Sequence, residues 1–178
     1  PTPVIGMVGL LSNIKQNTTI AFKDAGDFIV TLGALNGCLG GSEYLRTIHG
    51  RIQGPIPHLN LELEMGIQEL CLDAIKKGII KSAHDLSDGG LAVNISESLV
   101  HSKPGLGVRL DVERKLENNE LLFGECQSLI IVSLKESALY ELILLAQKLD
   151  MHTQTIGRVT DAARLIVNDH IDISRKKL

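Results

Sequence analysis

The residues best suited to chemistry lie in one short stretch, Ala83-His84-Asp85-Leu86-Ser87-Asp88-Gly89-Gly90. An apolar run precedes it and a helical pattern follows, so it falls where a strand ends and a helix begins. Backbone N–H groups and the helix dipole can hold an anion at such a junction, and glycines let a ligand approach the backbone. The two aspartates would repel bare phosphate unless Mg²⁺ or ribose hydroxyls stood between them, so a nucleotide or sugar-phosphate edge fits better. The candidate residues are His84, Asp85, Ser87, Asp88, Gly89 and Gly90.

The same stretch also fits an ordinary capped helix. Asp85 or Ser87 would be the N-cap, Asp88 would favour the first turn, and His84 would pack with both ring nitrogens satisfied. Because helix starts of this composition are common, the residues taken alone favour capping.

Two further segments could line a binding site. The glycine loop Gly40-Gly41-Ser42 precedes a short helical pattern and could cradle a phosphate, although no Walker loop is present and Ser42 also suits an N-cap. Glu125 and Gln127 stand just before an apolar run, where they could face a cleft or simply begin a strand.

A search for nucleophiles and metal ligands finds no convincing set. Cys38 lacks the glycine pattern of a glutaminase elbow, no Gly-x-Ser-x-Gly occurs, and no two histidines stand at i,i+4. The three widely spaced cysteines argue against a disulfide framework and indicate a reducing cytoplasm. We therefore predict neither catalytic residues nor a metal site in this chain.

Hydrophobic periodicity predicts the elements that would position these residues. Predicted strands cover residues 4–11, 27–32, 79–83, 108–112, 127–134, 153–159 and 163–167, the first two buried on both faces and the last two forming a closing hairpin. Predicted helices begin after Ser42, span residues 59–77, follow Gly90, and open at a Ser133-x-x-Glu136 capping box. Interleaved strands and helices predict one domain over residues 1–178, a three-layer α/β/α sandwich with a mixed sheet.

Composition narrows the possible partners. The net charge of −3 with a single short basic cluster argues against nucleic acid, and no apolar run is long enough to span a membrane. The 44% hydrophobic content exceeds what one small core requires, so part of it is expected to cover a partner surface. Pro1, followed at once by an apolar run, suggests excision from a longer chain, although loss of an initiator Met would leave the same start.

Four ordered motifs resemble one family, phosphoribosylformylglycinamidine synthase, over nearly the whole chain. They are residues 3–11 (PVIGMVGLL), 40–45 (GGSEYL), 82–92 (SAHDLSDGGLA) and 122–128 (LFGECQS). The chain is most similar to the second copy of the C-terminal-type domain that this family shares with aminoimidazole ribonucleotide synthetase.

The resemblance implies a cytoplasmic purine-biosynthesis ligase. Such an enzyme uses ATP and Mg²⁺ to phosphorylate the amide oxygen of formylglycinamide ribonucleotide, and glutamine-derived ammonia then displaces the phosphate. It also implies that most ATP and Mg²⁺ ligands and the catalytic histidine lie on another type of domain. This chain would be a scaffold and one wall of a pseudo-symmetric site that holds a structural nucleotide in large members, with the remaining synthetase domains and a glutaminase domain or subunit as partners.

The candidate residues match the family motifs in the two glycine loops and at Glu125 and Gln127. Where many relatives read Ser-Glu-Ser-Gln, this chain has Gly124-Glu125-Cys126-Gln127, which removes two hydroxyl groups from the strand entry. Two alternatives remain open: the corresponding domain of a selenophosphate synthetase or thiamine-phosphate kinase, and a non-enzymatic binding module that forms a homodimer through its apolar surplus.

Overall fold

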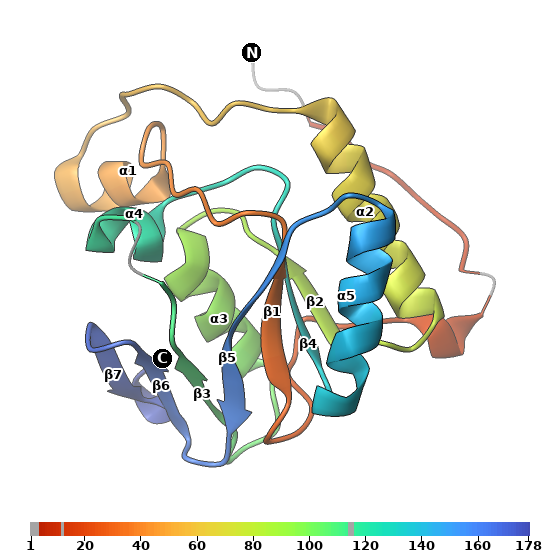
Figure 1. Cartoon of the computed structure of the whole chain (residues 1–178). Helices are drawn as coiled ribbons and strands as arrows, with labels where there is room; N and C mark the ends of the chain where they lie inside the picture. The colour runs from red at the N-terminus through yellow and green to blue at the C-terminus, as the bar shows by residue number, and fades with distance from the viewer. Residues whose placement is uncertain (1–3, 12, 114–115) are drawn as a thin grey trace.

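The central feature of the structure is a seven-stranded sheet in the order β2-β4-β1-β5-β3-β6-β7 (Figure 1). The computed structural model describes residues 4–11, 13–113 and 116–178. All neighbouring strands are antiparallel except β3 and β6, which are parallel, so the sheet is mixed as predicted. The strands are β1 (Phe28–Leu32), β2 (Ser82–Asp85), β3 (Gly107–Leu110), β4 (Ile130–Leu134), β5 (Thr153–Thr160), β6 (Arg164–Val167) and β7 (Ile171–Ser174).

Helices cover both faces of this sheet, which confirms the three-layer arrangement (Figure 1). The helices are α1 (Glu43–His49), α2 (Leu61–Lys76), α3 (Gly90–Val100), α4 (Asn118–Phe123) and α5 (Leu139–Lys148), with 3-10 turns η1 (Ile14–Gln16), η2 (Glu136–Ala138) and η3 (Arg175–Lys177). Helices α3 and α4 pack on one face, and α2 and α5 pack on the other. Among the described residues, no helix is both long and apolar enough to cross a membrane.

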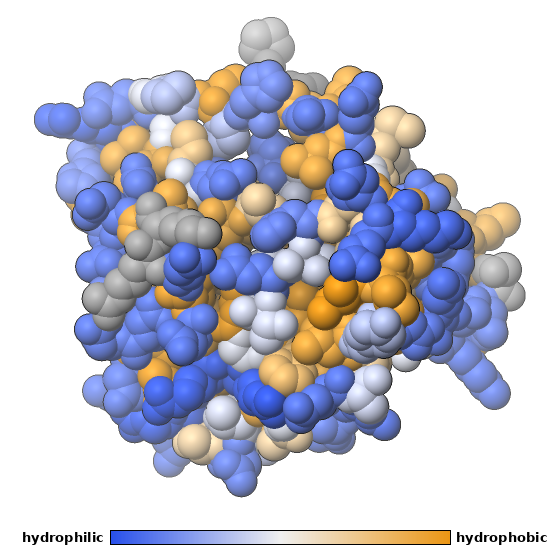
Figure 2. Space-filling view, in the orientation of Figure 1, coloured by the Kyte–Doolittle hydropathy of each residue, from blue (hydrophilic) through white to orange (hydrophobic). Residues whose placement is uncertain are grey.

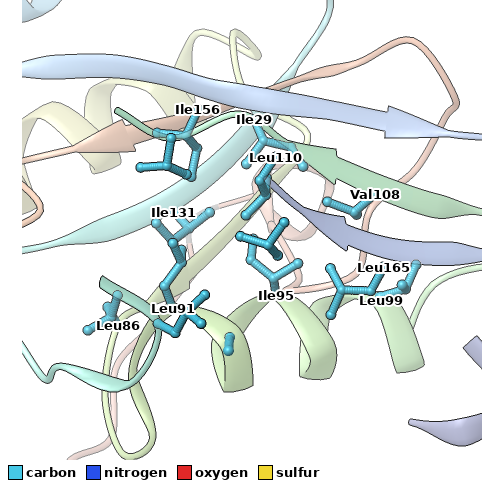
Figure 3. Close-up of a cluster of buried hydrophobic side chains, with 14 of the residues drawn as sticks. Ile29, Leu86, Leu91, Ile95, Leu99, Val108, Leu110, Ile131, Ile156 and Leu165 are labelled. Carbon is cyan, nitrogen blue, oxygen red and sulfur yellow. The ribbon is translucent and has the colours of Figure 1, made fainter. Parts of the chain in front are cut away.

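Each sheet face forms its own core because side chains alternate along a strand. In β1, Ile29 belongs to the core under α3, whereas Val30 and Leu32 belong to the core under α2 and α5. Figure 3 shows Leu91 and Ile95 of α3 directed toward the sheet, at the helical spacing from which this buried face was predicted.

The predicted strand over residues 4–11 is wrong. These residues form neither strand nor helix, and the side chains of Val8 and Leu10 are about fully exposed, at 101% and 102%. An apolar run indicates a buried strand only when neighbouring elements supply ladder partners and cover both faces, and here residues 4–11 have neither.

The second predicted strand is confirmed as β1, whereas others are displaced. The strand predicted at 79–83 is β2, which begins at Ser82, and the strand predicted at 127–134 is β4, which begins at Ile130. Ile79 and Ile80 are buried in the connection before β2 but do not belong to the strand. Because a buried apolar run looks like a strand in the sequence, the predicted start of β2 came three residues too early.

Two other predictions about the second half of the chain fail. Ser133 does not open a capping box: it lies in β4, and its Oγ is 2.6 Å from Ser82 Oγ across the ladder. The predicted closing hairpin of β5 and β6 does not form, because β3 lies between them, and β6 pairs instead with β7. The short elements α4 and β7 were not predicted.

Candidate functional site

A cleft of about 340 Å³ opens where β2 ends beside the start of β4 and the first half of α2. The antiparallel register pairs Asp85 with Ile130, so the polar residues after β2 meet those before β4. Two of the predicted residues, Asp85 and Gln127, line this cleft. Its lining consists of Glu64, Ile67, Gln68, Asp85, Leu86, Gln127, Ser128, Leu129 and Ile130.

Sequence reasoning missed the contribution of α2 to the cleft. Glu64 accepts hydrogen bonds from Gln68 Nε2 and from Ser128 Oγ, both at 2.7 Å. The i,i+4 pair of Glu64 and Gln68 marks one face of α2 in the sequence, but nothing local indicates that this face borders β4. The Ser128 backbone has a φ of 55°, which turns its hydroxyl toward α2 just before the strand begins.

The second glycine turn does not use a side-chain cap. Gly89 is the N-cap of α3 in the left-handed conformation, with φ of 83°, and no side chain of the turn itself caps this helix end. Asp85, Ser87 and Asp88 are exposed instead. The alternative in which Asp85 or Ser87 caps the helix is therefore wrong, because a left-handed N-cap sets a turn that only Gly89 adopts without strain.

Both ring nitrogens of His84 lie within reach of polar side chains on α3. Its Nδ1 lies 3.1 Å from Ser98 Oγ, and its Nε2 lies 3.4 Å from Glu97 Oε2, both on α3. The ring nitrogens are satisfied by the helix that follows, as the packing alternative predicted.

The first glycine loop caps α1 as predicted. Ser42 Oγ accepts a hydrogen bond from the Leu45 amide at 3.3 Å and donates one to the Leu39 carbonyl at 2.6 Å. A Cβ at Gly40 would stand 1.8 Å from the Pro55 carbonyl oxygen, so backbone contact explains that glycine. Gly41 is exposed beside it.

Glu125 joins the two glycine turns. Its Oε1 accepts hydrogen bonds from the Glu43 amide at 2.8 Å and from the Gly89 amide at 2.9 Å. Its own amide donates to the Cys38 carbonyl at 2.8 Å. Glu125 thus brings the end of the first glycine loop and the Gly89 turn together, with a carboxylate of the chain itself bound to the amides, whereas Gln127 and Asp85 line the cleft.

We call the exposed edge formed by Asp85, Ser87, Asp88 and Gln127 the rim, and its charged members are both acidic. Arg46 forms an ion pair with Glu43, and this hydrogen bond holds the pKa of the Glu43 carboxyl below its usual value. Asp88 is close enough to Arg46 to help raise the pKa of its guanidinium, and both Asp85 and Asp88 are exposed. Burial raises the pKa of the Cys126 thiol, next to Glu125, so that thiol stays protonated and is a poor nucleophile. Over the described ranges, no three His, Cys, Asp or Glu residues gather closely enough to hold a metal ion.

The sequence of most of the chain matches one known family. Residues 24–170 match the family described as "AIR synthase related protein, C-terminal domain". This chain belongs to that family.

The relatives that carry this domain are longer proteins. The chain is 48% identical over 135 residues to phosphoribosylformylglycinamidine synthase subunit PurL of Alkaliphilus metalliredigens, covering 76% of this chain and 18% of the relative. It is 41% identical over 167 residues to the PurL subunit of an Anaeromyxobacter species, covering 89% of this chain and 22% of the relative. The resemblance to this synthase is confirmed, and the chain spans about a fifth of the relatives' length.

Solved structures confirm the fold of this AIR synthase related domain. Thermotoga maritima PurL complexed with FGAR superposes with a TM-score of 0.75 at 19% identity, covering 92% of this chain and 29% of that one. The same protein complexed with ADP gives 0.69 at 18% identity, covering 92% and 27%. A thiamine-monophosphate kinase from Stenotrophomonas maltophilia gives 0.57 at 20% identity, covering 86% and 53%.

Proposed function

We propose that this chain is the second C-terminal-type domain of a phosphoribosylformylglycinamidine synthase. The whole enzyme would make formylglycinamidine ribonucleotide from formylglycinamide ribonucleotide, ATP and glutamine-derived ammonia, in the cytoplasm. The observation that carries this proposal is the 48% identity to a PurL subunit over most of the chain. The coverage of 18% of that relative supports further synthetase domains in the same polypeptide.

Within that enzyme, the cleft would form one wall of a nucleotide-dependent site. The side chains free to meet a ligand are those of Asp85, Ser87, Asp88 and Gln127, which are exposed at or near the rim. Carboxylates and an amide accept hydrogen bonds from hydroxyl groups, so a ribose edge suits this wall better than a bare phosphate. ATP phosphates and Mg²⁺ would be held mainly by another domain, with the exposed aspartates able to contact a Mg²⁺-bound nucleotide from this side.

An apolar surface on α2 suits the neighbouring domain. Leu61, Met65 and Leu72 lie on one helical face and are 66%, 70% and 54% exposed, although the opposite face of α2 is already buried. Leu72 also lines a groove of about 430 Å³ together with Leu10 and Leu11. Figure 2 shows hydrophobic residues at the surface near the upper end of α2. A helix that is apolar on both faces is typical of one buried between two layers.

The activity test compares the chain with the complete polypeptide. We expect the complete polypeptide to make formylglycinamidine ribonucleotide from its precursor with ATP and ammonia, and the 178-residue chain to make none. Synthesis by the chain alone would refute the role of a wall. Phosphorylation of thiamine monophosphate by the complete polypeptide, without synthase activity, would favour the kinase alternative.

The partner surface has its own test. Met65→Lys should leave the melting temperature of the chain nearly unchanged, because the side chain is exposed, but should weaken association with the separately produced remainder of the polypeptide. Glu141→Gln, at an exposed position of α5, also raises the net charge by one and is the matched control for the added charge. A salt-insensitive homodimer on a sizing column that Met65→Lys dissociates would favour the binding-module alternative.

A further inference from the structure

The contacts of Glu125 distinguish it from every other acidic residue at the rim. A single carboxylate oxygen accepts from the first residue of α1 and from the N-cap of α3, segments 82 and 36 residues away in the sequence. Two converging backbone amides are the arrangement that anion sites use for an external ligand. Here the anion is supplied by the chain.

Backbone packing fixes the position of this carboxylate. A Cβ at Gly124 would stand 2.6 Å from Gly37 Cα and 2.8 Å from the Cys38 nitrogen, so the strand entry lies directly on the first loop. A Cβ at Gly90 would stand 2.7 Å from the Gly124 carbonyl oxygen, so it also lies on the second turn. The three loops meet backbone to backbone, and Glu125 follows at the point of contact.

An aromatic pair supports the same junction. The rings of Tyr44 on α1 and Phe123 at the end of α4 stack with centroids 5.2 Å apart and planes 15° apart. This stack places α1 beside the chain segment that carries Glu125 and limits how far the carboxylate can swing out.

We propose that the Glu125 carboxylate is the resident anion of the two glycine turns. It replaces a phosphate, holds α1 against the N-terminus of α3, and gives the rim its shape before any ligand binds. Glu125 is therefore a positioning residue, and ligands of the cleft meet the rim side chains and not the turn amides. This inference concerns the chain alone and does not depend on the synthase assignment.

The test is chemical rescue in the 178-residue chain. Glu125→Ala should lower the melting temperature by about 3–8 °C, because two part-buried amides lose their acceptor. Formate at about 0.1 M should restore at least half of this loss, with chloride at equal ionic strength restoring much less. Formate is the probe because Asp88 and Glu43 oppose a dianion at the same place.

Two variants make the rescue specific. Glu125→Gln keeps an acceptor of the same reach and fills the same space, so we expect a smaller loss and no response to formate. Glu69→Ala removes an exposed carboxylate on α2 and should change neither the melting temperature nor the formate response. A response to formate that is equal in all three variants would overturn the proposal.

If Glu125→Ala fails to fold, hydrogen exchange of the backbone amides in Glu125→Gln tests the proposal. In Glu125→Gln, the amides of Glu43 and Gly89 should exchange at least about tenfold faster than in the unmodified chain, with the Ile95 amide inside α3 unchanged. Unchanged exchange at both amides would contradict the proposal. A second contradicting result would be that inorganic phosphate stabilises the unmodified chain more than sulfate does. This would show that the turn amides are free to bind a phosphate.

Discussion

Replacement of Lys81 by Met should destabilise the chain strongly. The Lys81 ammonium lies 2.6 and 2.8 Å from the two carboxylate oxygens of Asp27 and 2.7 Å from Asp24 Oδ2. The Asp27 side chain is only 4% exposed, whereas that of Asp24 is 58% exposed. The substitution therefore leaves one buried carboxylate without its cation, and the Met side chain fills most of the space that the lysine stem occupied.

The expected loss follows from this burial. Breaking a buried pair by removing one partner costs about 3–5 kcal/mol, a large share of the about 5–15 kcal/mol that stabilises a typical domain. Asp27 precedes β1 and Lys81 precedes β2, so the pair ties an interior strand to the edge strand that ends at Asp85 in the cleft. Loosening of β2 should accompany the loss of stability.

Urea unfolding followed by circular dichroism measures the difference in unfolding free energy. Lys76→Met is the matched control, because Lys76 pairs with Asp73 on the surface of α2 at 3.8 Å, and such pairs contribute about 0–1 kcal/mol. If Lys81→Met lowered the unfolding free energy no more than Lys76→Met does, the argument from burial would be refuted. Lys81→Met combined with Asp27→Asn should recover part of the loss, since it removes the isolated charge.

Further predictions concern pH, the rim, the end of α3 and the cysteines. Burial lowers the pKa of Lys81, but its bonds to Asp24 and Asp27 outweigh burial, so the net effect of folding is to raise this pKa. The stabilisation by Lys81 should therefore be complete below about pH 10.4 and be lost as the pH rises further, which unfolding experiments at alkaline pH would measure. Asp88→Asn should leave the melting temperature nearly unchanged, because Asp88 caps nothing, but should alter thermal stabilisation by ADP if the rim faces a nucleotide. Arg175→Ala should cost about 1–3 kcal/mol in urea unfolding, because its guanidinium donates to the carbonyls of Val100, Ser102 and Leu106, at the end of α3 and in the loop that follows. A loss equal to that of exposed Lys176→Ala would contradict this. Burial raises the pKa of Cys71 to about 11, so iodoacetamide at neutral pH should label Cys38 well before Cys71, as read by peptide mass; equal rates would show that the core opens readily.

Local patterns predicted the elements whose evidence lies within a few residues. The apolar face of α2, the face of α3 and the Ser42 cap all depend on contacts three or four positions apart, and the structure confirms each of them. The motifs also predicted the family, since a sequence match does not require knowledge of the contacts.

The sequence predicted two of the five polar residues that line the cleft. Asp85 and Gln127 were named because they flank apolar runs, and both line it. Glu64 and Gln68 were missed because a polar pair on a helix surface looks the same whether it faces solvent or a neighbouring strand.

By itself, the sequence determined most of the longer helices and strands and the family to which they belong, but not α4, β7 or the unpaired state of residues 4–11. Only the tertiary structure decided what stabilises the ends of α3, which carries no acidic residue in its first turn and no basic residue in its last. The charges come from Glu125 at one end, 36 residues from the turn that it binds, and from Arg175 at the other, 73 residues from Ser102. The helix dipole stabilises an anion at the N-terminus and a cation at the C-terminus, wherever in the chain these residues stand. Contacts between residues so far apart in the sequence produce no periodic pattern from which they could be predicted.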